Sequence, residues 1–178
     1  MIYLEYIRSI PIVLWLKICN NKNLAISWKQ RINTSFSIKT INKGKITIRG
    51  VLHSRRNCSL ICDRGHLSVG NGVFLNQNVM ITCLDEITIG DNVTIANNVV
   101  IVDHDHNFRD SNGNNYTMHS VHIGDNTWIG ANSVILKGAY IGESCVVAAG
   151  TVVKEGTYPP HSIIFNKRET KVSEYINE

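Results

Sequence analysis

The stretch "IGDNTW IGANSV ILKGAY IGESCV VAAGTV VKEGTY", residues 123–158, decides the fold because it repeats every six residues. Each hexad begins with an aliphatic residue and carries a small residue at its fifth position. An α-helix would repeat its apolar residues every 3.6 positions and a plain strand every two. Because six is a multiple of two and not of 3.6, the period of six is compatible with strands and not with a helix. The stretch therefore predicts short strands wound into a coil, with like residues stacked in a narrow core.

The same pattern appears earlier in the chain, although less strictly. Hexads begin at Val69 and Leu75 and, after a slip of two residues, at Ile89 and Ile95. Gly, Asn and Asp recur between them, and these residues suit tight corners because Gly and Asn reach left-handed backbone conformations cheaply. An ordinary sandwich of short strands is the alternative, but twelve in-phase positions in the later stretch favour a coil.

These hexads resemble those of the hexapeptide-repeat acyltransferases, among them the maltose and galactoside acetyltransferases and the polysaccharide O-acetyltransferases. The resemblance covers roughly residues 46–160 and is weak before residue 67. It implies an all-β fold, a left-handed parallel β-helix, and a homotrimer with active sites between subunits. The left hand comes from the resemblance alone, because parallel crossovers are ordinarily right-handed. We expect an N-terminal apolar and basic segment, partly helical, over 1–45, the β-helix over 46–160 and a tail over 161–178.

The repeat is interrupted by "VDHDHNFRDSNGNNYTMHSVHIGDN", residues 102–126. The hexad begun by Ile101 should be followed by one at position 107, but the next clear hexad begins sixteen residues later, at Ile123. A long insertion on a tight solenoid is more often functional than accidental. We therefore expect an extruded loop over 102–122. The relatives extrude a loop here just after a histidine, which implies His106 as the catalytic residue, with His104 as the nearby competitor.

The implied chemistry explains why a histidine is needed. Transfer of an acetyl group from acetyl-CoA to a sugar hydroxyl requires a base for the hydroxyl proton, and an imidazole that titrates near neutrality can take it. Asp103 or Asp105 could orient such a histidine, although either also suits a turn. We expect His119 and His122, at the return of the loop, to be loop or interface residues.

The resemblance implies further contacts with both substrates. Asn76 matches an asparagine that positions the acceptor or the histidine, although a corner Asn is an equal interpretation, and Asp85 could bond sugar hydroxyls. Trp128, whose indole is large for the interior, matches a tryptophan along the pantetheine arm of CoA. At the end of the chain "FNKRETKV" replaces the Gly-x-Pro-Ala-Lys of the relatives. The other expected CoA contacts, groove-lining residues and cations for the phosphates, are Ala131, Ala149, Gly150, Lys154, Lys167, Arg168 and Lys171.

Basic residues gather in the first third of the chain. Residues 1–62 hold eleven Lys and Arg against Glu5 alone, within a total net charge of +4. This asymmetry suits an anionic neighbour such as a membrane or a phosphate-bearing acceptor, and a solvated basic face is an equal interpretation. The opening "MIYLEYIRSIPIVLWLKIC" is too interrupted by charge to span a bilayer. It could lie in a membrane interface through Trp15, or pack on its own protein or a partner chain, which we favour slightly.

The remaining sequence features limit the cellular location and the possible functions. Five cysteines without CxxC spacing, and no secretory signal before them, predict a cytoplasmic protein, with the inner membrane face as a further location. No nucleic-acid-binding pattern is recognisable, and no metal is expected. We predict acetylation of a sugar hydroxyl in bacterial surface-polysaccharide (O-antigen or capsule) biosynthesis, on a nucleotide- or lipid-linked acceptor. Alternatives are N-acetylation of a nucleotide-linked amino sugar, a γ-carbonic-anhydrase-like zinc enzyme using the loop histidines, and a non-catalytic β-solenoid.

Overall fold

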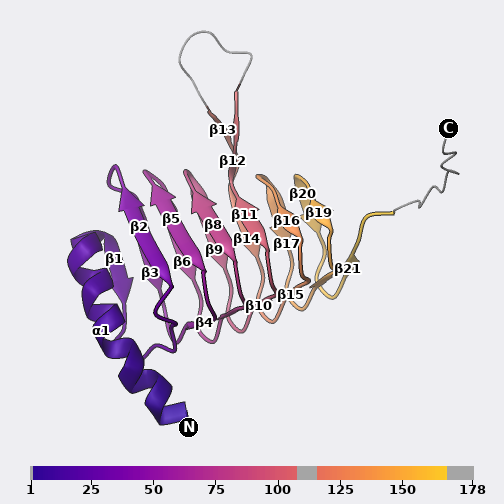
Figure 1. Ribbon diagram of the computed structural model, residues 1–178. Coiled ribbons are helices and arrows are strands. Elements are labelled where there is room, and N and C mark those ends of the chain that lie inside the picture. The colour runs from indigo at the N-terminus through magenta and orange to yellow at the C-terminus, as the bar shows by residue number, and fades with distance from the viewer. Residues whose placement is uncertain (1, 108–115, 168–178) are drawn as a thin grey trace, which may run out of the picture.

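The computed structural model describes residues 2–107 and 116–167 of the chain (Figure 1). It is a coil of short strands, with one helix lying across the N-terminal end and one hairpin standing out from the side (Figure 1). The strands of successive coils pair in parallel and form three sheets of seven, six and six strands. The chain is a left-handed parallel β-helix, so the coil that the hexads predicted and the left hand that the resemblance implied are both confirmed.

The three sheets are the three faces of the coil, and each strand pairs with its counterpart one coil away. Face A consists of β1 (Leu24–Ile26), β3 (Lys45–Ile48), β6 (His66–Val69), β9 (Glu86–Ile89), β14 (Val121–Ile123), β17 (Ala139–Ile141) and β20 (Gly156–Tyr158). Face B consists of β4 (His53–Ser54), β7 (Phe74–Leu75), β10 (Thr94–Ile95), β15 (Trp128–Ile129), β18 (Val146–Val147) and β21 (Ile163–Ile164). Face C consists of β2 (Ser37–Ile41), β5 (Ser59–Asp63), β8 (Met80–Cys83), β11 (Val100–Val102), β16 (Val134–Ile135) and β19 (Val152–Val153). The strands thus extend beyond residues 46–160 at both ends.

In the core, similar side chains of successive coils stack on one another. Ile89, Ile123 and Ile141 pair in register along face A and are fully buried. The small residues expected at fifth positions are buried as well, except Thr157, which is exposed. In that last coil the register shifts by one residue, because Tyr158 pairs with Ile141 and takes the inward row. The period of six therefore fixes the interior until the coil ends.

The corner between faces B and C shows why Asn recurs in the hexads. Asn57, Asn78, Asn98 and Asn132 all have φ between 57° and 60°, the left-handed region that Asn enters at low cost. Their side chains form a ladder, in which each amide nitrogen donates to the Oδ1 of the next Asn at 2.9–3.3 Å. The ladder links four coils and keeps the corner narrow.

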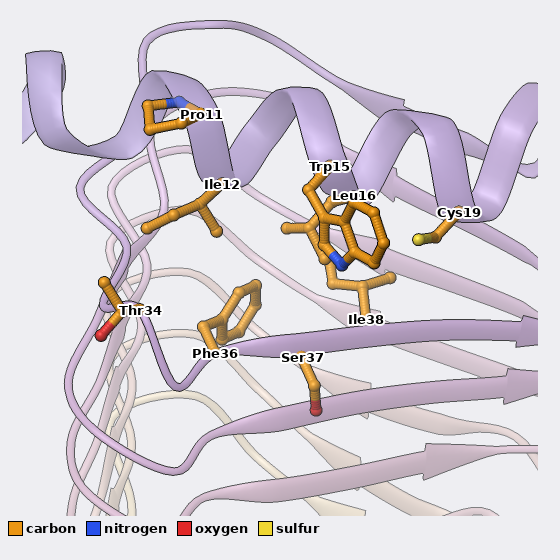
Figure 2. A pocket seen from close by; sticks show the side chains of 9 residues that line it. All are labelled: Pro11, Ile12, Trp15, Leu16, Cys19, Thr34, Phe36, Ser37 and Ile38. Atoms are coloured by element: carbon orange, nitrogen blue, oxygen red, sulfur yellow. The ribbon is translucent and has the colours of Figure 1, made fainter.

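Helix α1 (Ile2–Asn20), followed by the 3-10 turn η1 (Asn21–Asn23), covers the first coil. Val13 and Leu16 are buried against the coil, and Asn20 Oδ1 accepts a hydrogen bond from the Thr40 backbone N–H at 2.8 Å. In the described ranges, no helix is long and apolar enough to pass through a lipid bilayer. Beside α1, a groove of about 410 Å³ lies between Trp15 and Phe36 (Figure 2).

Candidate active site

The extruded segment leaves the coil at the corner between faces C and A, after β11 and before β14 (Figure 1). Its base is an antiparallel hairpin of β12 (His104–His106) and β13 (Tyr116–Met118). His104 pairs with Met118 and His106 pairs with Tyr116. The predicted loop over 102–122 is thus an ordered hairpin where it joins the coil, and residues 108–115 at its outer end lie outside the described residues.

Asp103, the first residue of this segment, is a fully buried carboxylate. Its oxygens accept the backbone N–H groups of Leu84, at 2.9 and 3.0 Å, and of Asp85, at 2.8 Å. They also lie 2.9 Å from Nδ1 of His104. A buried charge is tolerated only when it is bonded in this way, so the hydrogen bonds hold the carboxylate at one place under the hairpin.

His104 is oriented by that carboxylate. Its side chain is only 14% exposed, and its ring packs edge-on against Tyr116 with centroids 5.5 Å apart. An ionised carboxylate can only accept hydrogen bonds, so Nδ1 of a neutral imidazole donates to Asp103 and Nε2 becomes the acceptor nitrogen. This is the arrangement that a general base requires.

His106 has a different environment on the same strand. Its side chain is exposed and lies beside the Tyr116 ring, with centroids 4.7 Å apart. Between the two histidines, the Asp105 carboxylate faces solvent and lies 3.5 Å from Nζ of Lys137. The alternation of a strand therefore turns His104 and His106 to the same side but leaves only His104 beside a buried carboxylate.

Buried Asp103 was one of two candidate orienting residues in the sequence, and the hydrogen bonds select it. Asp103→Asn should lower the free energy of unfolding by about 1–3 kcal/mol, because an amide NH₂ would face backbone donors. Asp105→Asn is the matched control, with an expected change near zero since that carboxylate is exposed. Urea unfolding of both variants measures the difference, and equal values would contradict the assigned role of Asp103.

Other polar groups surround the hairpin at the corner between faces C and A. Asp85 Oδ2 accepts a hydrogen bond from Ser120 Oγ at 3.2 Å, one coil below His104. His119 Nδ1 lies 3.0 Å from Glu155 Oε1. Tyr116 and Glu155 could not be found from the sequence, because residues inside an insertion follow no period and corner positions vary freely.

Three of the four histidines of this region are held by different partners. His104 bonds to Asp103, His119 to Glu155, and His122 stacks on Tyr140 on face A with ring centroids 4.4 Å apart. Burial lowers the pKa of His122. Within residues 2–107 and 116–167, no three His, Cys, Asp or Glu side chains are grouped as the ligands of a metal ion would be.

The residues expected to contact CoA gather mostly at another corner. Trp128 projects from face B and is 52% exposed, and Ala131, Ala149 and Gly150 follow at the corner between faces B and C. Gly150 N–H donates to Ala131 O at 2.7 Å, which joins the two coils there. Asn76 occupies the same corner nearer the N-terminus, where its Oδ1 accepts the Gln77 N–H at 2.9 Å.

The expected cations are dispersed. Lys154 follows β19 at the corner between faces C and A, on the His104 side, and Lys167 is exposed beyond β21. Arg168 and Lys171 lie outside the described residues. The candidate residues therefore form two groups on one chain. His104, Asp85 and Lys154 lie at the corner between faces C and A. Trp128 lies on face B, which is opposite that corner, and Asn76, Ala131, Ala149 and Gly150 lie at the corner between faces B and C.

Comparisons with known proteins fit this architecture. The model "Bacterial transferase hexapeptide (six repeats)" matches residues 120–155, and "Hexapeptide repeat of succinyl-transferase" matches residues 67–102. The two matches end and begin at the borders of the hairpin segment. No curated protein matches the sequence.

Solved structures share the fold. AntD, an N-acyltransferase from Bacillus cereus, is 21% identical with a TM-score of 0.65, over 78% of this chain and 76% of that one. A maltose O-acetyltransferase from Clostridium difficile 630 is 22% identical with a TM-score of 0.52, over 95% and 89%. A hexapeptide-repeat containing acetyltransferase from Vibrio cholerae is 25% identical with a TM-score of 0.50, over 74% and 66%.

Both matched blocks of repeats, and the fold, are similar to those of hexapeptide-repeat acyltransferases. These similarities support an acyltransferase, and in this chain a histidine-bearing hairpin separates the two blocks of repeats.

Proposed function

We propose that the protein transfers an acetyl group from acetyl-CoA to a hydroxyl of a sugar that is carried on a nucleotide or lipid pyrophosphate. The observation that carries the proposal is the pair formed by buried Asp103 and His104 at the base of the hairpin. The structures that share the fold support an acyl-CoA donor and a sugar acceptor. AntD was solved with dTDP and 3-hydroxybutyryl-CoA, and another of the structures is a maltose O-acetyltransferase.

In the proposed reaction, His104 Nε2 takes the proton of the sugar hydroxyl while its oxygen attacks the thioester carbonyl. The new C–O bond gives a tetrahedral oxyanion. Collapse of this intermediate breaks the C–S bond, and the imidazolium returns its proton to the leaving thiolate, so that CoA and the acetylated sugar result. The negative charge of Asp103, 2.9 Å from Nδ1, stabilises the imidazolium while it exists.

The geometry supports His104 as the base in place of His106, the residue that the resemblance implies. A catalytic base has to be held in one tautomer and one orientation, and the buried carboxylate of Asp103 supplies both. His106 is exposed, and its position beside the Tyr116 ring suits a contact with substrate. In this proposal His106 contacts the acceptor sugar, and Asp85 bonds its hydroxyls from the coil below.

The two groups of candidate residues support a homotrimer with shared sites. The outward row of face C is apolar over four coils, where Met80, Val100, Val134 and Val152 pair in register. Packing three C faces around one axis would bury this row. It would also bring the corner between faces C and A of one subunit, with His104, next to the corner between faces B and C of its neighbour, with Trp128, Ala149 and Gly150.

The charge distribution supports an anionic acceptor. Arg55 and Arg56 are exposed at the corner between faces B and C, and Arg55 lies directly below Asn76, because Arg55 N–H donates to Leu75 O at 2.8 Å. In the proposed trimer these cations of one subunit line the approach to the partner subunit's His104. Guanidinium groups bind pyrophosphate through strong, charge-assisted hydrogen bonds.

Release of CoA from acetyl-CoA, followed with free sugars and their nucleotide- or lipid-pyrophosphate forms, tests the proposal. We expect kcat/KM to be about tenfold or more higher for the carrier-linked sugar, since each charge-assisted hydrogen bond contributes about 1.5–3 kcal/mol. Added salt should reduce this advantage by screening. Equal rates for the free and carrier-linked sugar, with no effect of salt, would contradict the carrier.

Substitution of Arg55 and Arg56 by Ala sharpens this test. The double variant should lose the preference for the carrier-linked sugar but keep its activity on the free sugar. Arg49→Ala is the matched control, because Arg49 is equally exposed but lies at the corner between faces A and B, beside Asp91. Nucleotide-linked amino sugars belong in the same panel, since His104 could equally deprotonate an ammonium group.

A further inference from the structure

The outward side of α1 is apolar. Of the fifteen large hydrophobic side chains that are exposed in the described residues, seven lie on this helix. Their exposed fractions are high, for example 84% for Tyr3 and 65% for Trp15. The seven residues, which we call the outer face of α1, are Tyr3, Leu4, Ile7, Ile10, Leu14, Trp15 and Ile18.

The protein's own core does not explain this surface. The helix already has a buried side, on which Val13 and Leu16 pack against the first coil. A helix that covers a solenoid end needs one apolar stripe and would otherwise be polar. An apolar outer face as well is the pattern of a surface that is covered by something else.

Cations surround the outer face. Lys17 Nζ lies 4.6 Å from the centre of the exposed Trp28 ring, and Lys29 Nζ lies 5.5 Å from the centre of the Tyr6 ring. Arg8 and Lys22 are exposed on or next to the helix. The only acidic residue of the helix is Glu5, and its carboxylate is paired with Arg31. The surface is therefore apolar in the centre and positive at the rim.

We propose that the outer face of α1 docks in the interfacial zone of an anionic lipid bilayer. Helices that lie in this zone insert an apolar face while Lys and Arg remain at the lipid headgroups, and Trp and Tyr are favoured at that depth. A second copy of the same face would oppose like charges, Lys17 and Lys29 of each chain, whereas anionic headgroups complement them.

The groove beside the helix enlarges the apolar surface. It is lined by Pro11, Ile12, Trp15, Leu16 and Cys19 from α1 and by Phe36 and Ile38 from the first coil, together with the polar residues Thr34 and Ser37 (Figure 2). The indole thus belongs both to the outer face and to the groove. A lipid chain next to Trp15 would find continuous apolar contact from the helix to the coil.

Docking by α1 would also orient the enzyme. The helix lies across the N-terminal end of the coil, and the cations Arg55 and Arg56 lie between that end and the coil that bears the hairpin. The lipid surface would then face the basic end of the molecule. Lipid binding does not require the transfer reaction, so its test is independent of the proposed activity.

Sedimentation of the full chain with vesicles tests the proposal. We expect binding to mixed phosphatidylcholine and phosphatidylglycerol vesicles and little binding to phosphatidylcholine alone. The double variant Ile7→Ser/Ile18→Ser should bind at least about tenfold more weakly, since each buried aliphatic side chain contributes substantially. The control Ile163→Ser/Phe165→Ser removes two equally exposed apolar side chains at the other end of the coil and should bind like the unchanged protein.

Charge is tested separately. Lys17→Ala and Lys29→Ala should each weaken binding about fivefold, the factor that corresponds to about 1 kcal/mol per cation near an anionic surface. Lys167→Ala, at the C-terminal end, is the control. Absence of vesicle binding by the unchanged chain would overturn the proposal. So would a change in molecular mass in the Ile7→Ser/Ile18→Ser variant with unchanged vesicle binding, because the face would then join copies of the chain.

Discussion

His104→Asn is expected to lower kcat/KM for acyl transfer by about 10²–10⁴-fold, the contribution of a positioned general base. Asparagine keeps a polar group beside Asp103 but cannot accept and return the hydroxyl proton. KM for acetyl-CoA should change little, because His104 is expected to contact the acceptor hydroxyl, while most of the expected CoA contacts lie on face B and at its corner with face C. Steady-state kinetics with varied acetyl-CoA separates the two effects.

His106→Asn is the matched control on the same strand. It should keep the assembly intact and affect mainly KM for the acceptor, because His106 is exposed and lies beside Tyr116. If His106→Asn is the inactive variant and His104→Asn is not, the base is the residue that the resemblance implies. The bond between Asp103 and His104 would then serve only to anchor the hairpin to the coil.

The period of six predicted the coil because few arrangements of side chains fit the narrow interior. An aliphatic residue such as Ile129 can stack only on its counterpart one coil away, so the sequence must repeat whenever the chain completes a face. The corner residues carry similar information, since Asn98 and Asn132 adopt a backbone conformation that few residues tolerate. The first coils were harder to predict, because longer strands such as β2 and β5 loosen the period.

The site was predicted less completely than the fold. The insertion could be located because it breaks the period, but the period says nothing about residues within it. Asp103 illustrates the difficulty. It is the last residue of the inward row of face C before the hairpin, and it lies next to Cys83. Only the pairing of the strands in three dimensions shows that its carboxylate is buried. A turn residue and a buried orienting residue have the same appearance in the sequence.

In the two proposals, the cations in the basic third of the chain have two separate roles. Lys17 and Lys29 lie at the rim of the outer face of α1, where they suit headgroups, while Arg55 and Arg56 lie on the coil, on the way to the hairpin. An acceptor held by a lipid pyrophosphate would pass these groups in that order. The apolar face and the two groups of cations are thus consistent with one orientation of the enzyme on the proposed lipid surface.

The second large effect concerns assembly of the site from two subunits. His104→Asn and Ala149→Tyr should each inactivate the proposed trimer, the first by removing the base and the second by filling the expected CoA groove at the corner between faces B and C. In a mixed trimer, one interface pairs the intact histidine of an Ala149→Tyr subunit with the intact groove of a His104→Asn subunit. Mixed trimers should therefore recover about a third of the activity of the unchanged protein, by symmetry.

Co-expression of the two variants with different affinity tags, followed by purification on both tags, isolates the mixed trimers. The control is a mixture of the two separately purified homotrimers, which should remain inactive while the subunits do not exchange. Recovery requires that His104 and Ala149 of one site come from different chains, because a site within a single chain would be defective in every subunit. Mixed trimers as inactive as the two parents would place both groups on one chain. The apolar row Met80, Val100, Val134 and Val152 would then have to be covered in another way.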